Sequence, residues 1–167
     1  MGTLADAQRF AELAACKVKI MTVGEIISSE SWKRSPPIAH WKLDETAGST
    51  ADDSAGDNHG AVHGDPNWQP GGGKVDGALE LDGVDDYVST DFVLNPADGP
   101  FSVFAWVKGG SPGEVIASQT TASGRSWLLA DSAGGRLMTD LRAPGRGAPP
   151  LVSEFVITDG DWHQIGL

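Results

Sequence analysis

Short apolar runs separated by turn-forming residues fill the chain from residue 38 onward. Apolar and polar positions alternate over residues 38–43, which predicts a strand that directs Trp41 into the core. Further strands are expected at residues 60–63, 78–81, 86–90, 101–108, 114–119, 126–131, 137–141, 152–157 and 164–167. Segments with helical periodicity are scarce in this region. The pattern therefore predicts an all-β fold, with the strand at 101–108 near its centre.

The segments between these strands are rich in residues that form turns. Residues 44–60 and 65–77 combine Gly with Asp, Asn or Pro, and both are expected to be loops. Trp68 is expected to anchor the second loop against the core. Two consecutive glycines at 134–135 predict a hairpin turn. The 22 glycines and ten prolines of the chain suit a fold with many such turns.

The first part of the chain has a different pattern. Apolar residues recur with helical spacing over residues 4–18, and Thr3 can cap their start, so a helix is expected there. Serines, charged residues and two consecutive prolines over residues 28–37 are typical of a linker. The chain is therefore expected to comprise an N-terminal helix and linker, residues 1–37, and one β domain, residues 38–167. The helix could dock or dimerise, or it could be a plain appendage.

Negative charge is concentrated in the β region. The formal net charge is -11, and residues 1–37 carry four acids and five bases, so 19 acids and seven bases remain for the β region. Clusters of Lys and Arg, on which phosphate binding depends, are absent there, so neither nucleic acid nor an anionic membrane is expected as a partner. Cations and neutral sugars suit such a surface.

Compartment and membrane signals are weak. The single cysteine, Cys16, cannot form an internal disulfide. No window approaches the about 20 apolar residues of a membrane span, so membrane insertion is not expected. The N-terminus lacks the basic and apolar regions of a secretion signal, so no signal peptide is expected in the chain as given.

Several phrases of the β region follow one another in a recognisable order. They are Trp-Lys-Leu-Asp-Glu at 41–45, Asp-Ser-Ala-Gly-Asp-Asn-His-Gly at 53–60, Leu-Asp-Gly-Val-Asp-Asp-Tyr-Val at 81–88, Phe-Ser-Val-Phe-Ala-Trp-Val at 101–107 and Asp-Trp-His at 161–163. Together they resemble the laminin-G-like jelly roll of the concanavalin A-like lectin/glucanase superfamily. The resemblance covers residues 38–167. It implies two stacked antiparallel sheets, but it does not by itself fix the ligand.

The resemblance also implies that further strands follow the Asp-Trp-His phrase. In such domains the Asp-Trp-His phrase opens a strand that continues into a further hairpin and returning strands. The resemblance therefore implies a C-terminally incomplete piece of a longer extracellular or cell-surface protein. A sandwich without its closing strands would expose core surface and unpaired sheet edges.

The acids at 80–86 allow a catalytic interpretation. Glu80, Asp82 and Asp85 resemble the Glu-x-Asp-x-x-Glu strand of the superfamily's glucanases, in which a nucleophile and an acid/base lie about 5 Å apart. Here the third acid has a shorter side chain, and Gly83 interrupts the strand. The other residues of this phrase, Leu81, Val84 and Tyr87, are expected to face or border the core.

Calcium binding and turn chemistry are the other two interpretations. Members of the superfamily often hold calcium, a cation that takes several oxygen ligands from loops. The expected ligands are Asp53, Asp57 and Asn58 on one loop, with Asp82 or Asp85 from the other. The same acids could instead accept hydrogen bonds from the backbone of their own turns, and the sequence leaves both interpretations open.

Tryptophans and histidines are further candidates for binding a ligand or a metal ion. The chain has six tryptophans, of which Trp41, Trp106 and Trp162 are expected in the core, whereas Trp32, Trp68 and Trp127 are the freer candidates for stacking on a ligand. The histidines lack zinc-like spacing, apart from His59 and His63, and are expected to be ordinary surface or strand residues. The sequence thus predicts a non-catalytic recognition or adhesion module for a glycan or an extracellular protein. A glycoside hydrolase and a structural spacer are the alternatives.

Overall fold

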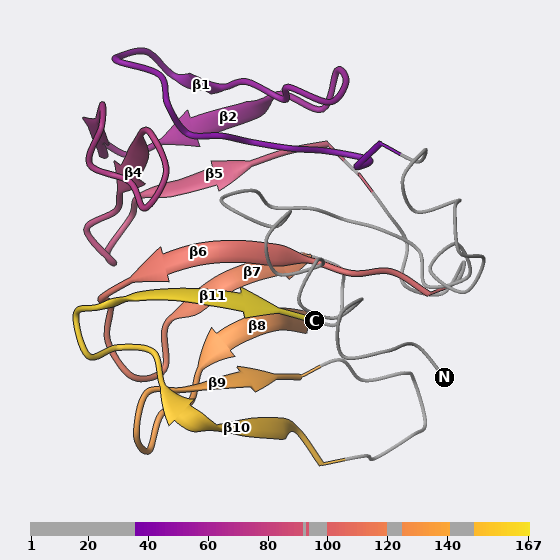
Figure 1. Cartoon of the computed structure of the whole chain (residues 1–167), viewed down its shortest axis with the longest axis vertical. Coiled ribbons are helices and arrows are strands. Elements are labelled where there is room, and N and C mark those ends of the chain that lie inside the picture. The colour runs from indigo at the N-terminus through magenta and orange to yellow at the C-terminus, as the bar shows by residue number, and fades with distance from the viewer. Residues whose placement is uncertain (1–35, 92, 94–99, 120–124, 141–148) are drawn as a thin grey trace, which may run out of the picture. The chain divides into compact units, whose positions relative to one another are not determined.

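The computed structural model describes residues 36–91, 93, 100–119, 125–140 and 149–167. Within these ranges the regular elements are strands, and the strand pairs with defined register run antiparallel (Figure 1). This confirms the all-β prediction for the described residues. None of them belongs to a helix long and apolar enough to cross a membrane. The helix expected over residues 4–18 lies outside the described residues.

The chain divides into two compact units. Their bounds are Met1–Trp106 with Gly166 for the first and Val107–Ile165 with Leu167 for the second. In the described part of the first unit, β1, β2 and β5 form one sheet in that order, and β3 and β4 form another. These strands are β1 (Thr50–Ala51), β2 (Gly60–His63), β3 (Asn67–Gln69), β4 (Ala78–Glu80) and β5 (Tyr87–Ser89).

The sheet of β1, β2 and β5 has an inner and an outer face. Val62 lies opposite Val88 in the register, and both are half-buried. His63 lies opposite Tyr87, and because side chains alternate along a strand these two point to the other face. Gly60 is buried, and a Cβ there would lie 2.5 Å from Cγ1 of Val88. Close packing of the strands therefore requires glycine at this position.

The second unit contains a four-stranded sheet in the order β10-β9-β8-β7 (Figure 1). Its strands are β7 (Val115–Gln119), β8 (Arg125–Ala130), β9 (Arg136–Thr139) and β10 (Leu151–Val156). Leu128, Ala130 and Ile157 are buried in this unit. The remaining strands, β6 (Phe104–Lys108) and β11 (Trp162–Gly166), pair as a two-stranded sheet.

The predicted hairpin turn between β8 and β9 is confirmed. The Asp131 carboxylate accepts hydrogen bonds from the backbone N–H groups of Ala133 at 2.9 Å and Gly135 at 3.1 Å. Gly135 has a φ of 67°, and a Cβ there would lie 2.0 Å from Oγ1 of Thr158. Both the backbone conformation and the lack of space favour glycine at this turn.

Most of the expected strands form within a few residues of their predicted bounds, but the prediction for residues 38–43 is wrong. This segment makes only an isolated antiparallel bridge, between Trp41 and Asp53. Two local features stop a strand from forming. The backbone N–H of His40 donates to a side chain, Asp53, and Leu43 has a φ of 57°, outside the extended region.

Three further expectations are corrected. The segment 65–77, expected to be only a loop, contains β3. The last strand, β11, begins at Trp162, two residues before the apolar run at residue 164 and within the Asp-Trp-His phrase. The strand at 101–108, expected near the centre of the fold, is observed as β6 in a two-stranded sheet of the described residues.

The expected core is also revised. Leu81, Val84 and Tyr87, expected to face or border the core, are 48%, 86% and 53% exposed, so none of them is buried in it. The turn at residues 81–86 leaves the strand pattern, which places the first two in solvent. Trp41 is half-buried. The tightest packing instead involves small residues, Ala39 and Ala51, which are both 0% exposed.

Candidate functional site

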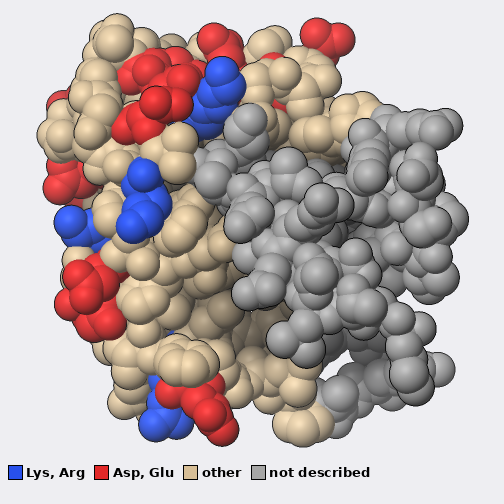
Figure 2. All heavy atoms as spheres, in the orientation of Figure 1, with Lys and Arg blue, Asp and Glu red and all other residues tan. Residues whose placement is uncertain are grey.

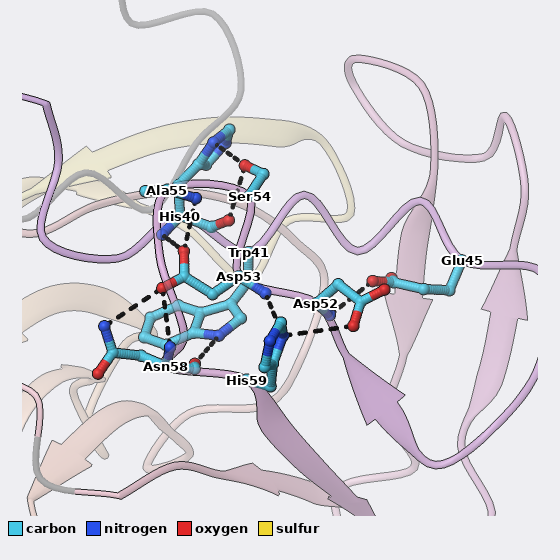
Figure 3. Close-up of polar contacts among 9 residues, drawn as sticks. All are labelled: His40, Trp41, Glu45, Asp52, Asp53, Ser54, Ala55, Asn58 and His59. Carbon is cyan, nitrogen blue, oxygen red and sulfur yellow. Dashed lines mark hydrogen bonds and ion pairs between the residues drawn. The ribbon is translucent and has the colours of Figure 1, made fainter.

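Asp53 is the polar centre of the first unit, in the loop between β1 and β2. Its side chain is buried, and the residue is only 5% exposed. Oδ1 accepts hydrogen bonds from the backbone N–H groups of His40 at 2.8 Å and Ala55 at 2.9 Å. Oδ2 accepts from the backbone N–H and the side-chain Nδ2 of Asn58 at 3.1 and 3.2 Å (Figure 3). Both oxygens are therefore occupied by donors from the protein itself.

Neighbouring contacts tie the same two segments together. Trp41 donates from Nε1 to the carbonyl oxygen of Asn58 at 2.8 Å, and Ser54 donates its backbone N–H to the carbonyl of His40 at 2.9 Å. Oγ of Ser54 also lies 2.6 Å from Nδ1 of His40 (Figure 3). Burial raises the pKa of Asp53, but the hydrogen bonds from Ala55, His40 and Asn58 lower it more, so its pKa lies below the ordinary value. Asp53 is thus a charged residue that organises its loop.

A second, more exposed group lies beside Asp53. The backbone N–H of Asp52 donates to Oε1 of Glu45 at 2.7 Å. Nδ1 of His59 accepts the backbone N–H of Asp53 at 3.2 Å and also lies 3.4 Å from Oδ1 of Asp52 (Figure 3). Nδ1 can accept the first bond only when it carries no proton. In the tautomer that carries its hydrogen on Nδ1, the ring would instead donate to the Asp52 carboxylate.

The turn between β4 and β5 is built around Asp82 and Asp86. Oδ1 of Asp82 accepts the backbone N–H groups of Val84, Asp85 and Asp86 at 2.8, 3.3 and 3.4 Å. The two oxygens of Asp86 accept the N–H groups of Asp65 and Asp82 at 2.8 and 2.9 Å. The hydrogen bond from Val84 is the main cause that lowers the pKa of Asp82. For Asp53 and Asp82, hydrogen bonding to turn backbone is therefore observed.

The fit to calcium is limited to the second of these loops. One oxygen from each of Asp82, Asp85 and Asp86 lies within 4.8 Å of the others. Calcium takes about six to eight oxygen ligands, so this set would supply part of a site and water the rest. Among the described acids, Asp53 and Asp57 do not join this group, and Asn58 instead donates from Nδ2 to Asp53 at 3.2 Å. The five predicted ligands are therefore not brought together, and Asp86 is a candidate that the sequence interpretation missed.

Glu80 of β4 lies on an exposed polar strip with two amides. Its Oε2 accepts hydrogen bonds from Nε2 of Gln69 at 2.7 Å and from Nδ2 of Asn67 at 3.2 Å. Asn67 lies opposite Glu80 in the register of β3 and β4. The i, i+2 spacing of the amides places both on the face of the carboxylate. The acid expected to be catalytic under the hydrolase interpretation is thus held by side-chain amides.

An aromatic pair occupies the outer face of β2 and β5. The rings of His63 and Tyr87 are stacked, with centroids 4.3 Å apart and planes at 11°. Nε2 of His63 lies 2.8 Å from Oγ of Ser89. The sequence interpretation expected Tyr87 to face or border the core and missed this pair. Its signal was the alternation around Val88, which takes the inward position and leaves its two neighbours on the outer face.

Among the tryptophans expected to contact a ligand, Trp68 is half-buried and donates from Nε1 to the carbonyl of Gly48 at 2.9 Å. Trp32 and the side chain of Trp127 lie outside the described part of the chain. Acidic side chains are visible in the upper part of the face drawn in Figure 2, where Figure 1 shows β1 and β2.

No protein-family model matches the chain, and comparison with curated proteins and with solved structures likewise found no match. The functional assignment therefore rests on the residues and contacts of this chain.

Proposed function

We propose that the chain is a non-catalytic recognition module, a laminin-G-like jelly-roll sandwich that binds a glycan or protein ligand within an extracellular or cell-surface protein. The coarse architecture supports this proposal, because the described strands form antiparallel sheets. The ordered phrases from Trp41 to His163 support it independently. Recognition surfaces are commonly carried by loops and strands of such rigid β scaffolds.

The observation that carries the proposal is the engagement of the acids. Asp53 and Asp82 accept hydrogen bonds from turn backbone, and Glu80 accepts two from amides. A glycoside hydrolase needs a carboxyl group that keeps its proton near neutral pH, which requires a raised pKa. The backbone instead lowers the pKa of Asp82, so Asp82 is not suited to be that acid, and Glu80 is held by two amides. This arrangement favours structural and binding roles for the acids.

Two measurements on the same protein test the proposal. Release of reducing ends from a panel of polysaccharides is expected to be absent, whereas retention on an array of glycans and matrix proteins is expected. Turnover that Glu80→Gln abolishes, and that the exposed control Glu154→Gln leaves intact, would establish a hydrolase and overturn the proposal. Loss of all retention would favour a spacer and would also overturn it.

A further inference from the structure

We propose that the outer face of β2 and β5 is a platform for a neutral glycan, with the ring of Tyr87 stacking against a pyranose ring. This inference rests on the recognition function proposed above and adds the site and the ligand class. Aromatic side chains with a polar end suit ligands that have both an apolar face and hydroxyl groups. A pyranose ring is such a ligand.

Tyr87 exposes part of its aromatic ring on the outer face of the sheet. The residue is 53% exposed although it is paired in the sheet, where it begins β5 opposite His63, the last residue of β2. The stacked imidazole covers one ring face at 4.3 Å. The exposed remainder offers an aromatic surface to solvent. Aromatic side chains give large contact area at a low cost in conformational entropy, because they have only two side-chain torsions.

The platform is held rigid by its neighbours. Nε2 of His63 is bonded to Oγ of Ser89 at 2.8 Å, and Ser89 shares the outer face with Tyr87 because the two are separated by one residue. On the inner face Val62 opposes Val88 and fixes the register. A ligand that stacks on Tyr87 would therefore find the ring already oriented, which reduces the entropic cost of binding.

The fixed backbone extends to the turn that precedes Tyr87. Gly64 follows β2 with a φ of 79°, and a Cβ there would lie 2.1 Å from Oδ1 of Asp86. The same oxygen accepts the N–H of Asp65 at 2.8 Å. Asp86 therefore joins the end of β2 to the start of β5. Both strands of the platform are thereby constrained where they meet the acidic turn.

Charge selects among possible ligands. Asp85 and Asp86 directly precede Tyr87, and a carboxylate oxygen of each lies within 4.8 Å of one of Asp82. No Lys or Arg forms an ion pair with these acids among the residues that the structure describes. Carboxylates accept hydrogen bonds from sugar hydroxyl groups but repel sulfated or uronic-acid chains. The expected ligand is therefore neutral.

The size of the platform favours a glycan over a protein. A specific protein interface buries about 800 Å² on each partner, far more than one exposed aromatic pair provides. Pockets and surfaces for small ligands need only a few well-placed aromatic and polar groups. His63, Tyr87 and Ser89 supply such a set on a scale that suits one or two sugar rings.

The chain offers a direct test, because Tyr87 is its only tyrosine. Protein labelled with ¹³C in the tyrosine ring gives resonances from this one side chain. We expect them to shift and saturate on titration with at least one of the hexasaccharides of cellulose, laminarin, xylan or mannan. Hexagalacturonate, an anionic probe, is expected to cause no shift. Calorimetry with the neutral ligand then gives the dissociation constant for variants.

Variants separate the roles of the two rings. Tyr87→Ala is expected to weaken binding by about tenfold or more, the size of a buried aromatic anchor. His63 is a positioning residue, so His63→Ala should weaken binding less, and His63→Phe, which restores stacking, should recover most of it. Phe155→Ala is the matched control, because Phe155 is an aromatic residue that is 75% exposed in the second unit, and it should leave binding unchanged.

The outcomes distinguish this inference from the proposed function. Binding of a neutral hexasaccharide without a shift at Tyr87 would overturn the platform while leaving a recognition module in place. A shift caused by hexagalacturonate alone would overturn the ligand class. Absence of binding by every hexasaccharide would overturn the platform, and retention on the array of matrix proteins would then still support recognition. The titration uses the wild-type chain, so it tests whether Tyr87 contacts the glycan even if a variant fails to fold.

Discussion

Two acidic loops of the first unit use the same chemistry for different purposes. Asp53 and Asp82 both accept hydrogen bonds from the backbone of a Gly-containing turn. Asp53 is 5% exposed and also binds His40, 13 residues away, whereas the bonds of Asp82 stay within four residues. The first aspartate joins two segments of the unit, and the second shapes only its own turn. The range of the hydrogen bonds therefore separates these two aspartates, although Asp86 of the second turn does reach Asp65, 21 residues away.

Asp53 and Asp82 also differ in how many of their carboxylate oxygens accept hydrogen bonds. Asp53 uses both: Oδ1 for His40 and Ala55, and Oδ2 for Asn58. Asp82 receives all three of its hydrogen bonds from the turn on Oδ1. A change from carboxylate to amide keeps one acceptor oxygen and replaces the other by an NH₂ donor. The same substitution therefore tests the two loops differently.

Asp53→Asn is expected to have the largest effect. Whichever way the new amide is turned, its NH₂ group faces donors, and at least one buried N–H loses its acceptor. Hydrogen bonds to charged groups and buried unsatisfied donors suggest a loss of about 3 kcal/mol in the free energy of unfolding. Urea denaturation measures this. Asp57→Asn, an exposed acid of the same loop, is the control and should change stability little.

Lowering the pH should reduce the difference in the free energy of unfolding between the wild type and Asp53→Asn. The pKa of Asp53 is lower in the folded protein than its ordinary value of 3.8. Its stabilising contribution is therefore complete above pH 3.8 and is lost as the pH falls through the lower folded-state pKa. The gap in free energy of unfolding between the wild type and Asp53→Asn should shrink from pH 6 to pH 3. A gap that stayed constant would show that shape, not charge, sets the role of Asp53.

Calcium is expected to act only on the second loop. At about 10 mM calcium, a site with a dissociation constant near 1 mM would raise the midpoint of thermal unfolding by about 3 to 5 °C. Asp85→Asn removes a carboxylate of the cluster, so it should abolish the shift, whereas Asp57→Asn should not. An unchanged midpoint in the wild type would contradict calcium binding, and the acids would then serve only as hydrogen-bond acceptors for the turn backbone.

Much of the fold follows from local pattern in the sequence. The strands from β7 to β10 and the turn at Asp131 were predictable, because alternation and paired glycines act over a few residues. Residues 38–43 were not, because the bond between His40 and Asp53 spans 13 positions and competes with strand pairing. A pattern of alternating residues carries no information on such a partner.

The candidate site was predictable only in part. The acidic turn at 81–86 follows from the Asp-Gly-Val-Asp-Asp letters, and hydrogen bonding by Asp82 was one of the open interpretations. The exposure of Tyr87 was not foreseen, since an aromatic residue beside Val84 and Val88 suggests a core. Which side of β5 is buried depends on its pairing with β2, a tertiary fact that brings His63 beside Tyr87.

The smallest change in stability is expected for a substitution in the second loop. Asp82→Asn keeps an oxygen at the Oδ1 position, so the N–H groups of Val84, Asp85 and Asp86 retain their acceptor. The midpoint of thermal unfolding should move by less than about 1 °C, whereas Asp82→Ala, which removes the acceptor from this exposed turn, should lower it by about 2 °C. A loss with Asp82→Asn as large as that with Asp53→Asn would contradict the distinction, because it would mean that both oxygens of Asp82 hold the unit together.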